Sequence, residues 1–115
     1  MPAVIKKSWE FDLIFRTGIR ANGDLVRLLF LRRDELKNEI KVGYTVGKHQ
    51  GKAHIRNRGK RILRAAFHEV TKNYNILPGT YFILGLKNKA LDSKSTEIFQ
   101  DLLKILQVKK LLSDD

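Results

Sequence analysis

Residues 55–75 show a helical pattern that separates apolar from cationic side chains, and this pattern constrains the fold more than any other feature of the sequence. At about 3.6 residues per turn, one face of the helix is apolar. That face carries Ile62, Leu63, Ala66, Phe67 and Val70. The opposite face carries Asn57, Lys60, Arg61, Arg64 and His68. Such a helix can pack on a core while it presents cations to solvent, so the pattern predicts a surface helix of a globular domain.

Positive charge also fills the loop before this helix. Residues 48–64 contain seven Lys or Arg and no Asp or Glu, in a 115-residue chain whose formal net charge is +11. A solvated helix face normally mixes signs, because i,i+4 ion pairs contribute about 0.2–0.5 kcal/mol each. Here Arg56, Lys60 and Arg64 repeat the same sign. We interpret the segment as a phosphate-binding surface of Arg forks and Lys point charges, with a plain solvated face as the alternative.

The uneven charge also indicates the kind of partner. A concentrated basic patch attracts polyanions by counterion release, which favours nucleic acid first and an anionic membrane surface second. The chain is 43% hydrophobic, which argues against a disordered tail, and it has no cysteine, which excludes disulfides and fits a reducing compartment. No apolar run approaches the roughly 18 residues of a membrane span, and no signal peptide is evident. We expect a cytoplasmic protein with no membrane partner.

The rest of the chain contains alternating signals for helices and strands. Ser8 is expected to cap a helix that stops at Gly18, and Asn22-Gly23 is expected to form a type I′ turn in a hairpin of residues 19–21 and 25–31. Residues 39–46 and 80–86 are further expected strands, and Ser93 or Ser95 opens a last helix that ends near Leu112. The order predicts a single α+β domain over residues 1–115, with helices covering one small sheet.

A specific motif spans the loop and the basic helix. It reads Lys48-x-x-Gly51-x-Ala53-x-x-Arg56-Asn57-Arg58-x-Lys60-Arg61-x-x-Arg64 and follows the strand KVGYTV of residues 41–46. The motif resembles the protein subunit of bacterial ribonuclease P. Phe11, Phe15 and Gly18 fit the first helix of that family, Phe30 fits an aromatic on its sheet, and TYFILGL fits its late strand. The resemblance covers nearly the whole chain.

The resemblance implies an α-β-β-β-α-β-α fold similar to a domain of ribosomal proteins, with a left-handed βαβ crossover. Strand and helix sterics alone would favour the right-handed form. The resemblance also implies an accessory subunit of a ribonucleoprotein that removes the 5′ leader from precursor tRNA. A large RNA is then the catalyst, and this RNA binds most of the Mg²⁺. The implied partners are the ribonuclease P RNA and precursor tRNA, with no small-molecule cofactor.

The family's motif residues carry over to named positions here. The residues expected to bind RNA are Lys48, His49, Lys52, Arg56, Asn57, Arg58, Lys60, Arg61 and Arg64. Phe11, Phe15 and Phe30 are expected to line a cleft between the first helix and the sheet that holds the leader. Aromatic faces stack on unpaired bases at roughly 1–3 kcal/mol each, whatever the sequence. The alternative is that these three rings are ordinary core, and Trp9 and Tyr44 share this ambiguity.

Three positions depart from the family pattern. His49 stands where a second Lys is frequent, and Ala65 stands where Glu often follows the last Arg. Gly59 lies inside the basic helix at a cost of about 1 kcal/mol against Ala. Either the helix begins after Gly59, or RNA approaches the backbone closely there.

The sequence contains no evident catalytic constellation. Its acids are scattered, and Glu10 and Asp12 are two residues apart and do not share a helix face. No metal-ligand spacing is present, so we expect no catalytic residue and no metal site in the protein. Two alternatives stay open. One is a ribosomal or other structural RNA-binding protein, and the other is a free-standing nuclease that uses His49 and His54.

Overall fold

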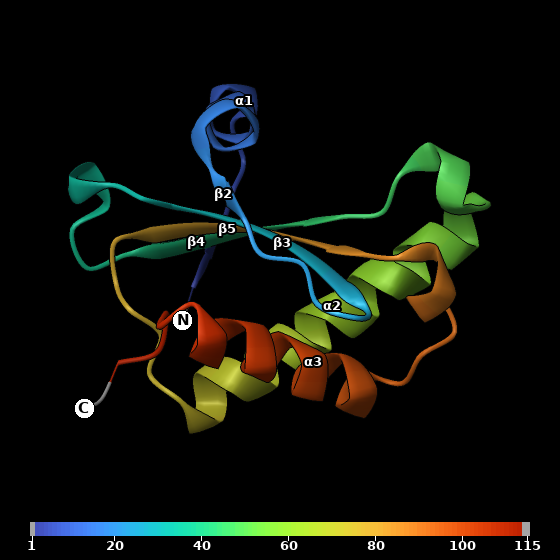
Figure 1. The fold of residues 1–115 in the computed structure, drawn as a ribbon. Coiled ribbons are helices and arrows are strands. Elements are labelled where there is room, and N and C mark those ends of the chain that lie inside the picture. Colours follow the sequence, from blue (N-terminus) through green and yellow to red (C-terminus); the bar gives the residue numbers. More distant parts are fainter. Residues whose placement is uncertain (1, 114–115) are drawn as a thin grey trace.

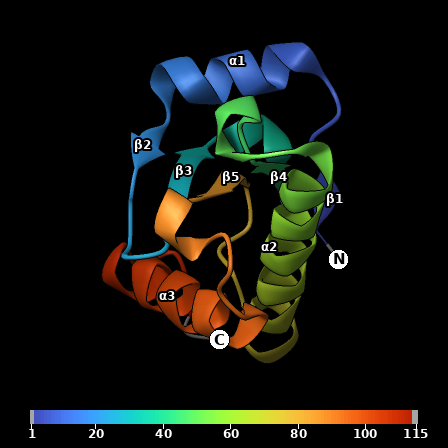
Figure 2. The same cartoon turned by 90° about the vertical axis from the view of Figure 1, so that its right-hand side faces the viewer.

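Helix α2 (Ala53–Asn73) is the longest element of the computed structural model, which describes residues 2–113. It lies beside α3 (Ser95–Val108) on one face of the sheet, while α1 (Ser8–Thr17) crosses the other face (Figures 1 and 2). Neither Ser8 nor Ser95 caps its helix through its side chain; each is the first helical residue. In α3 the Glu97 carboxylate accepts a hydrogen bond from the Lys94 backbone N–H instead. Helix α3 ends at Val108, before the expected Leu112.

The sheet has the strand order β1-β4-β5-β3-β2 within the described residues. The strands are β1 (Ala3–Val4), β2 (Ile19–Arg20), β3 (Val26–Arg32), β4 (Ile40–Thr45) and β5 (Thr80–Leu86). β5 pairs in parallel with β4 and antiparallel with β3, so the sheet is mixed and all seven β5 residues are buried. The expected α+β class is confirmed, with the two-residue strand β1 as an addition. β4, α2 and β5 form the βαβ crossover, whose left-handed sense stays a prediction.

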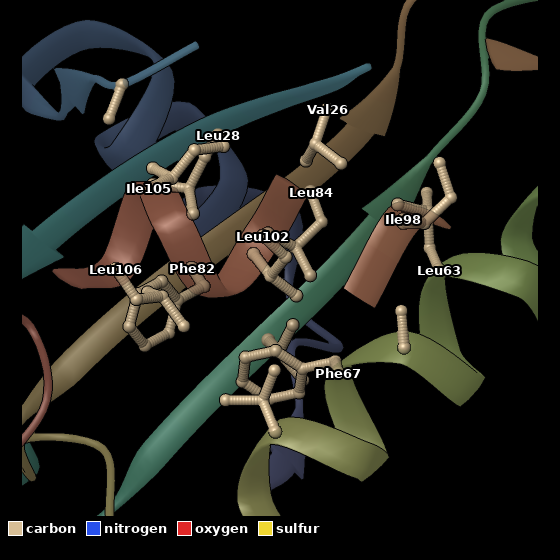
Figure 3. Close-up of a cluster of buried hydrophobic side chains, with 14 of the residues drawn as sticks. Val26, Leu28, Leu63, Phe67, Phe82, Leu84, Ile98, Leu102, Ile105 and Leu106 are labelled. Carbon is tan, nitrogen blue, oxygen red and sulfur yellow. The ribbon is translucent and has the colours of Figure 1, made fainter. Parts of the chain in front are cut away.

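The main core lies between the sheet and the pair α2 and α3 (Figure 3). Leu63, Ala66, Phe67 and Val70 of α2 are buried there, as the helical pattern predicted, and Ile62 is half-buried at the edge. The Phe67 ring packs against Phe82 of β5, with 5.7 Å between the ring centres. Each large apolar side chain buried in this way contributes roughly 1.5–3 kcal/mol. The position of α2 is therefore fixed by one face only.

Helix α1 covers a smaller apolar cluster on the opposite face of the sheet. This cluster contains Ile5, Ile14, Leu29, Leu36, Tyr81 and Ile83. Ile14 is fully buried, whereas Trp9 and Phe15 are 57% and 53% exposed. α1 therefore contacts the sheet along a narrow line and leaves two large aromatic side chains accessible to solvent.

The hairpin turn differs from the expected type I′ turn. Such a turn needs positive φ at both central residues, and neither Asn22 nor Gly23 has it. The Asp101 carboxylate of α3 instead accepts hydrogen bonds from the backbone N–H groups of Asp24, Leu25 and Val26, at 3.1, 2.9 and 2.9 Å. A Cβ at Gly23 would lie 2.5 Å from Asp101 Oδ2. A contact across the fold, and not local turn chemistry, sets this loop.

Gly59 has a third explanation that the sequence did not suggest. Helix α2 begins at Ala53, so the helix does not start late, and Gly59 is buried on its inner side. A Cβ at this position would lie 3.1 Å from Val46 Cγ2 and 3.3 Å from Leu86 Cδ1. The glycine therefore allows α2 to pack closely on the ends of β4 and β5. A close approach of RNA is not needed to explain it.

Candidate nucleic-acid interface

The outer face of α2 is cationic and open. Arg61 and Arg64 are exposed, and Lys60 is half-buried. Within residues 2–113, none of these three side chains forms an ion pair with an acid. Arg58 differs, because its Nη2 lies 2.9 Å from Asp92 Oδ1 and also donates to the Leu91 carbonyl. That pair is exposed to solvent and therefore contributes little to stability.

Arg64 lies over an aromatic ring of the sheet. Its guanidinium carbon is 5.4 Å from the centre of the Tyr44 ring, and Tyr44 in turn packs edge-on against Phe67. Burial raises the pKa of Tyr44 to about 12, although the nearby Arg64 charge opposes the shift. Tyr44 is therefore neither simple core nor a free ring. It joins the core to a surface cation and restricts where that cation can point.

The loop before α2 is anchored by Gln50. The Gln50 amide donates to the Leu86 carbonyl at 2.8 Å and to Asn88 Oδ1 at 2.9 Å, and its oxygen accepts from the Gly47 N–H at 2.9 Å. Gly51 has φ 138°, a conformation that side chains rarely adopt. The loop is thus held against the end of β5, and Lys48 and His49 stay exposed. Sequence reasoning missed Gln50, because its partners lie 36 and 38 residues away.

A cleft of about 530 Å³ opens between this loop, the start of α2 and the end of α1; we call it the central cleft. Four of the predicted RNA-binding residues line it: Lys48, His49, Arg56 and Lys60. Phe15 of α1 lines it as well. The structure therefore brings basic side chains of the motif and one predicted aromatic side chain to the same hollow.

Two further arginines line the central cleft without having been predicted. Arg20 lies on β2 and Arg27 on β3, and both are exposed. Arg27 interrupts the apolar run VRLLFL, and a lone charge in such a run is a signal that this part of the strand faces solvent. Arg20 has no comparable signal in the sequence.

The other two predicted cleft aromatics lie elsewhere. Phe30 is 8% exposed and belongs to the core cluster with α2 and α3, because it alternates along β3 with Leu29 of the α1 side. Phe11 is half-buried and covers Gly43 of β4, where a Cβ would lie 2.7 Å from Phe11 Cε1. The expectation that Phe30 lines the leader cleft is thus wrong, because its ring belongs to the core. Phe11 packs on the sheet away from the central cleft.

The remaining predicted residues are on the surface. Lys52 and Asn57 are exposed, and Asn57 lies within α2, beyond the position where it could cap the helix. Of the nine predicted residues, Lys52, Asn57, Arg58, Arg61 and Arg64 thus lie outside the central cleft. Their contacts with RNA stay predictions.

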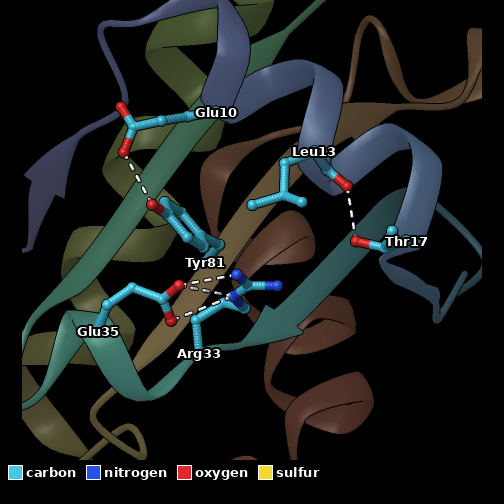
Figure 4. A network of polar contacts seen from close by, with 6 residues as sticks. All are labelled: Glu10, Leu13, Thr17, Arg33, Glu35 and Tyr81. Carbon is cyan, nitrogen blue, oxygen red and sulfur yellow. Dashed lines mark hydrogen bonds and ion pairs between the residues drawn. The ribbon is translucent and has the colours of Figure 1, made fainter.

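Among the acids of residues 2–113, only Glu10 is buried, and its environment is structural. Glu10 of α1 accepts hydrogen bonds from the Tyr81 hydroxyl at 2.9 Å and from Lys41 Nζ at 3.0 Å; Figure 4 shows the Tyr81 contact beside the exposed Arg33–Glu35 pair. Burial opposes ionisation of Glu10, but these two donors outweigh it and lower the pKa of Glu10. In residues 2–113, no group of three or more His, Cys, Asp or Glu could hold a metal ion.

The fold and the site together define a small basic α+β protein with a cationic helix beside an open cleft, and Lys60, Arg61 and Arg64 of that helix form no ion pair within residues 2–113. The family model for ribonuclease P matches residues 2–110. The ribonuclease P protein component of Shouchella clausii is 33% identical over 110 residues, which is 95% of this chain and 87% of that protein.

Solved structures give the same result. The Staphylococcus aureus RNase P protein superposes with a TM-score of 0.81 at 26% identity and covers 98% of this chain and 100% of its own. A mutant of that protein, described as having defective mRNA degradation activity, superposes with a TM-score of 0.79 at 26% identity over 96% of this chain and 89% of its own. The chain belongs to the ribonuclease P protein family. None of its described helices is long and apolar enough to cross a membrane.

Proposed function

We propose that this chain is the protein subunit of a bacterial ribonuclease P, where it binds the catalytic RNA and the 5′ leader of precursor tRNA. The observation that carries the proposal is the set of cations on α2 and its preceding loop, which lack acidic partners in the described residues, apart from Arg58, and continue into the central cleft. Ribonuclease P cuts at the 5′ end of tRNA, so its protein must tolerate many leader sequences. Charge and stacking provide contacts of that kind.

The nine motif residues then divide into two groups. Arg61 and Arg64 are exposed on α2 outside the central cleft and suit the rigid phosphate backbone of a folded RNA. Arg56 and Lys60 line the central cleft together with Phe15, which suits a flexible single strand whose bases can stack. One helix thereby holds the catalytic RNA and the substrate side by side.

The protein's contribution is electrostatic and positional. Cations beside the cleavage site reduce the repulsion between phosphates of the two RNAs, which favours binding of Mg²⁺ by the RNA at lower concentration. Mg²⁺ is held mainly by the partner RNA in this proposal, and the chain supplies no catalytic residue and uses no small-molecule cofactor. An assembly of this kind works in the cytoplasm, where precursor tRNA is made.

The direct test adds the purified protein to a bacterial ribonuclease P RNA at low Mg²⁺ and measures leader removal from precursor tRNA. We expect cleavage that the RNA alone does not achieve under these conditions. Normal RNA binding without stimulation would favour a ribosomal or other structural RNA-binding protein.

The free-standing nuclease remains the second candidate, because a structural relative is described by an mRNA degradation activity. His49 lines the central cleft, whereas His54 is exposed at the start of α2 outside it. A nuclease of the chain alone would cut RNA without the catalytic RNA and lose this activity in His49→Ala and His54→Ala. We expect no cleavage by the isolated protein.

A further inference from the structure

A second hollow lies between the β2–β3 hairpin and α3. Figure 2 shows the hairpin loop reaching the helix. This hairpin cleft has a volume of about 520 Å³. Its cationic lining residues are Arg20, Lys87, Lys104 and Lys109. Two carboxylates, of Asp24 and Asp101, also line it. The cations outnumber the acids, so the hollow favours an anion.

The cations of the hairpin cleft are available to a ligand. In the part of the chain that the structure describes, none of the four forms an ion pair or a side-chain hydrogen bond. The Asp101 carboxylate, in contrast, is already engaged by three backbone N–H groups of the hairpin. Of the two acids in the lining, Asp101 thus serves the fold, and the exposed Asp24 still leaves the hairpin cleft with an excess of cations.

The two clefts adjoin. Arg20 and Asn22 line both of them, and Leu86 of the central cleft is followed directly by Lys87 of the hairpin cleft. A strand that leaves the central cleft past Arg20 would next meet Lys87 and Lys104. The linings also differ in kind, because Phe15 and Tyr44 line the central cleft, whereas the hairpin cleft has no aromatic lining residue.

We propose that the hairpin cleft binds the phosphates of the 5′-distal part of the single-stranded leader, as an extension of the central cleft. This inference rests on the proposed function. Without stacking rings, the contact depends on charge alone, so it gains affinity from leader length and not from leader sequence. Precursors whose leaders end inside the central cleft do not reach it.

The test uses the assembled ribonucleoprotein and precursor tRNAs with a graded series of leaders up to about 16 nucleotides, the upper end of single-strand site sizes on one small domain. The variant is Lys87→Ala/Lys104→Ala, whose side chains line the hairpin cleft and not the central cleft. The matched control is Lys72→Ala/Lys94→Ala, which removes the same charge from exposed positions that line neither cleft. Thermal melting of both variants verifies that they fold.

We expect the hairpin-cleft variant to bind short-leader precursors like the wild type and long-leader precursors roughly tenfold more weakly at 0.15 M salt, because two lost phosphate contacts lower the salt slope by about 1.4. The control variant should bind short-leader and long-leader precursors with equal losses of affinity or with no loss. Equal losses for short and long leaders in the hairpin-cleft variant would overturn the inference. So would weaker assembly with the catalytic RNA, which would place that RNA in the cleft. If the wild-type protein does not stimulate cleavage at all, the proposed function fails instead.

A second measurement does not depend on affinity. The chain has no cysteine, so Val108→Cys, at an exposed position that lines the hairpin cleft, can carry a single photo-crosslinking group. We expect crosslinks to the 5′-distal nucleotides of long leaders. Crosslinks to the catalytic RNA alone, or none to the leader, would refute the inference.

Discussion

The guanidinium carbon of Arg64 lies 5.4 Å from the centre of the Tyr44 ring, which itself packs on Phe67 of the same helix as Arg64. The Tyr44 ring therefore contacts both an aromatic ring of the core and a surface cation. A cation held in this way loses less conformational freedom when it binds a phosphate, because part of its freedom is already lost in the free protein.

Tyr44→Leu should therefore weaken binding of the catalytic RNA, whereas Tyr44→Phe should retain wild-type affinity. The ring contact is expected to contribute about 0.5–1 kcal/mol, which Leu removes and Phe keeps. Affinity is measured by filter binding at fixed salt, and melting temperatures separate loss of packing from loss of the cation contact. Equal affinity for the Leu and Phe variants at equal stability would show that the ring does not position Arg64.

Asp101→Ala should destabilise the protein by about 1–3 kcal/mol, because three hairpin N–H groups lose their charged acceptor. Asp92→Ala is the matched control; it removes an exposed partner of Arg58 and should change stability little. Urea unfolding measures both. If the two variants had the same midpoint, Asp101 would not hold the hairpin loop.

Acid should weaken the attachment of α1. The folded pKa of Glu10 lies below its ordinary value of 4.5, so the carboxylate adds stability that is complete above about pH 4.5 and is lost as the pH falls through the folded pKa. Glu10→Gln should be less stable at neutral pH and should show a flatter decline in acid. The measurement is the free energy of unfolding against pH, and parallel profiles for both proteins would be the contrary result.

Alkali should also lower the stability of the protein, through Tyr81, which donates a hydrogen bond to Glu10. Burial, supported by the hydrogen bond to Glu10, raises the pKa of Tyr81 to about 12. The stability from the neutral hydroxyl is therefore complete below pH 10 and falls as the pH rises toward 12. Tyr81→Phe should reduce this alkaline loss in the same unfolding series, and the part that remains belongs to Tyr44, whose pKa burial also raises to about 12. A Tyr81→Phe profile that runs parallel to that of the wild type above pH 10 would be the contrary result.

Two phenylalanines should give opposite results when they are replaced by alanine. Phe30→Ala should cost about 3–5 kcal/mol of stability, because the ring is core. Phe15→Ala should leave stability nearly unchanged and reduce the preference for precursor over mature tRNA, by roughly 1–3 kcal/mol if one base stacks on the ring. Melting and substrate affinity are compared for each variant. A Phe15 variant that melts early but binds normally would place this ring in the core as well.

These cases also show what the sequence could predict. The two faces of α2 follow from a period within one helix, so Leu63 and Arg61 were placed correctly. The face of β3 to which Phe30 points depends on which helices cover each side of the sheet, and no local pattern contains that information. Gln50 and Asp101 act on partners 36 and about 76 residues away. The strand β1 has two residues, which is too short for any period to appear.

The most direct test of the central claim is the salt dependence of catalytic-RNA binding by Arg61→Ala, compared with Lys94→Ala as a control of equal charge. Arg61 is exposed on the outer face of α2 and forms no ion pair in residues 2–113, so its removal should reduce affinity and lower the salt slope by about 0.7–0.9, one phosphate contact. The control should leave the slope unchanged. A slope for Arg61→Ala equal to that of the wild type would mean that the cationic face of α2 does not bind RNA.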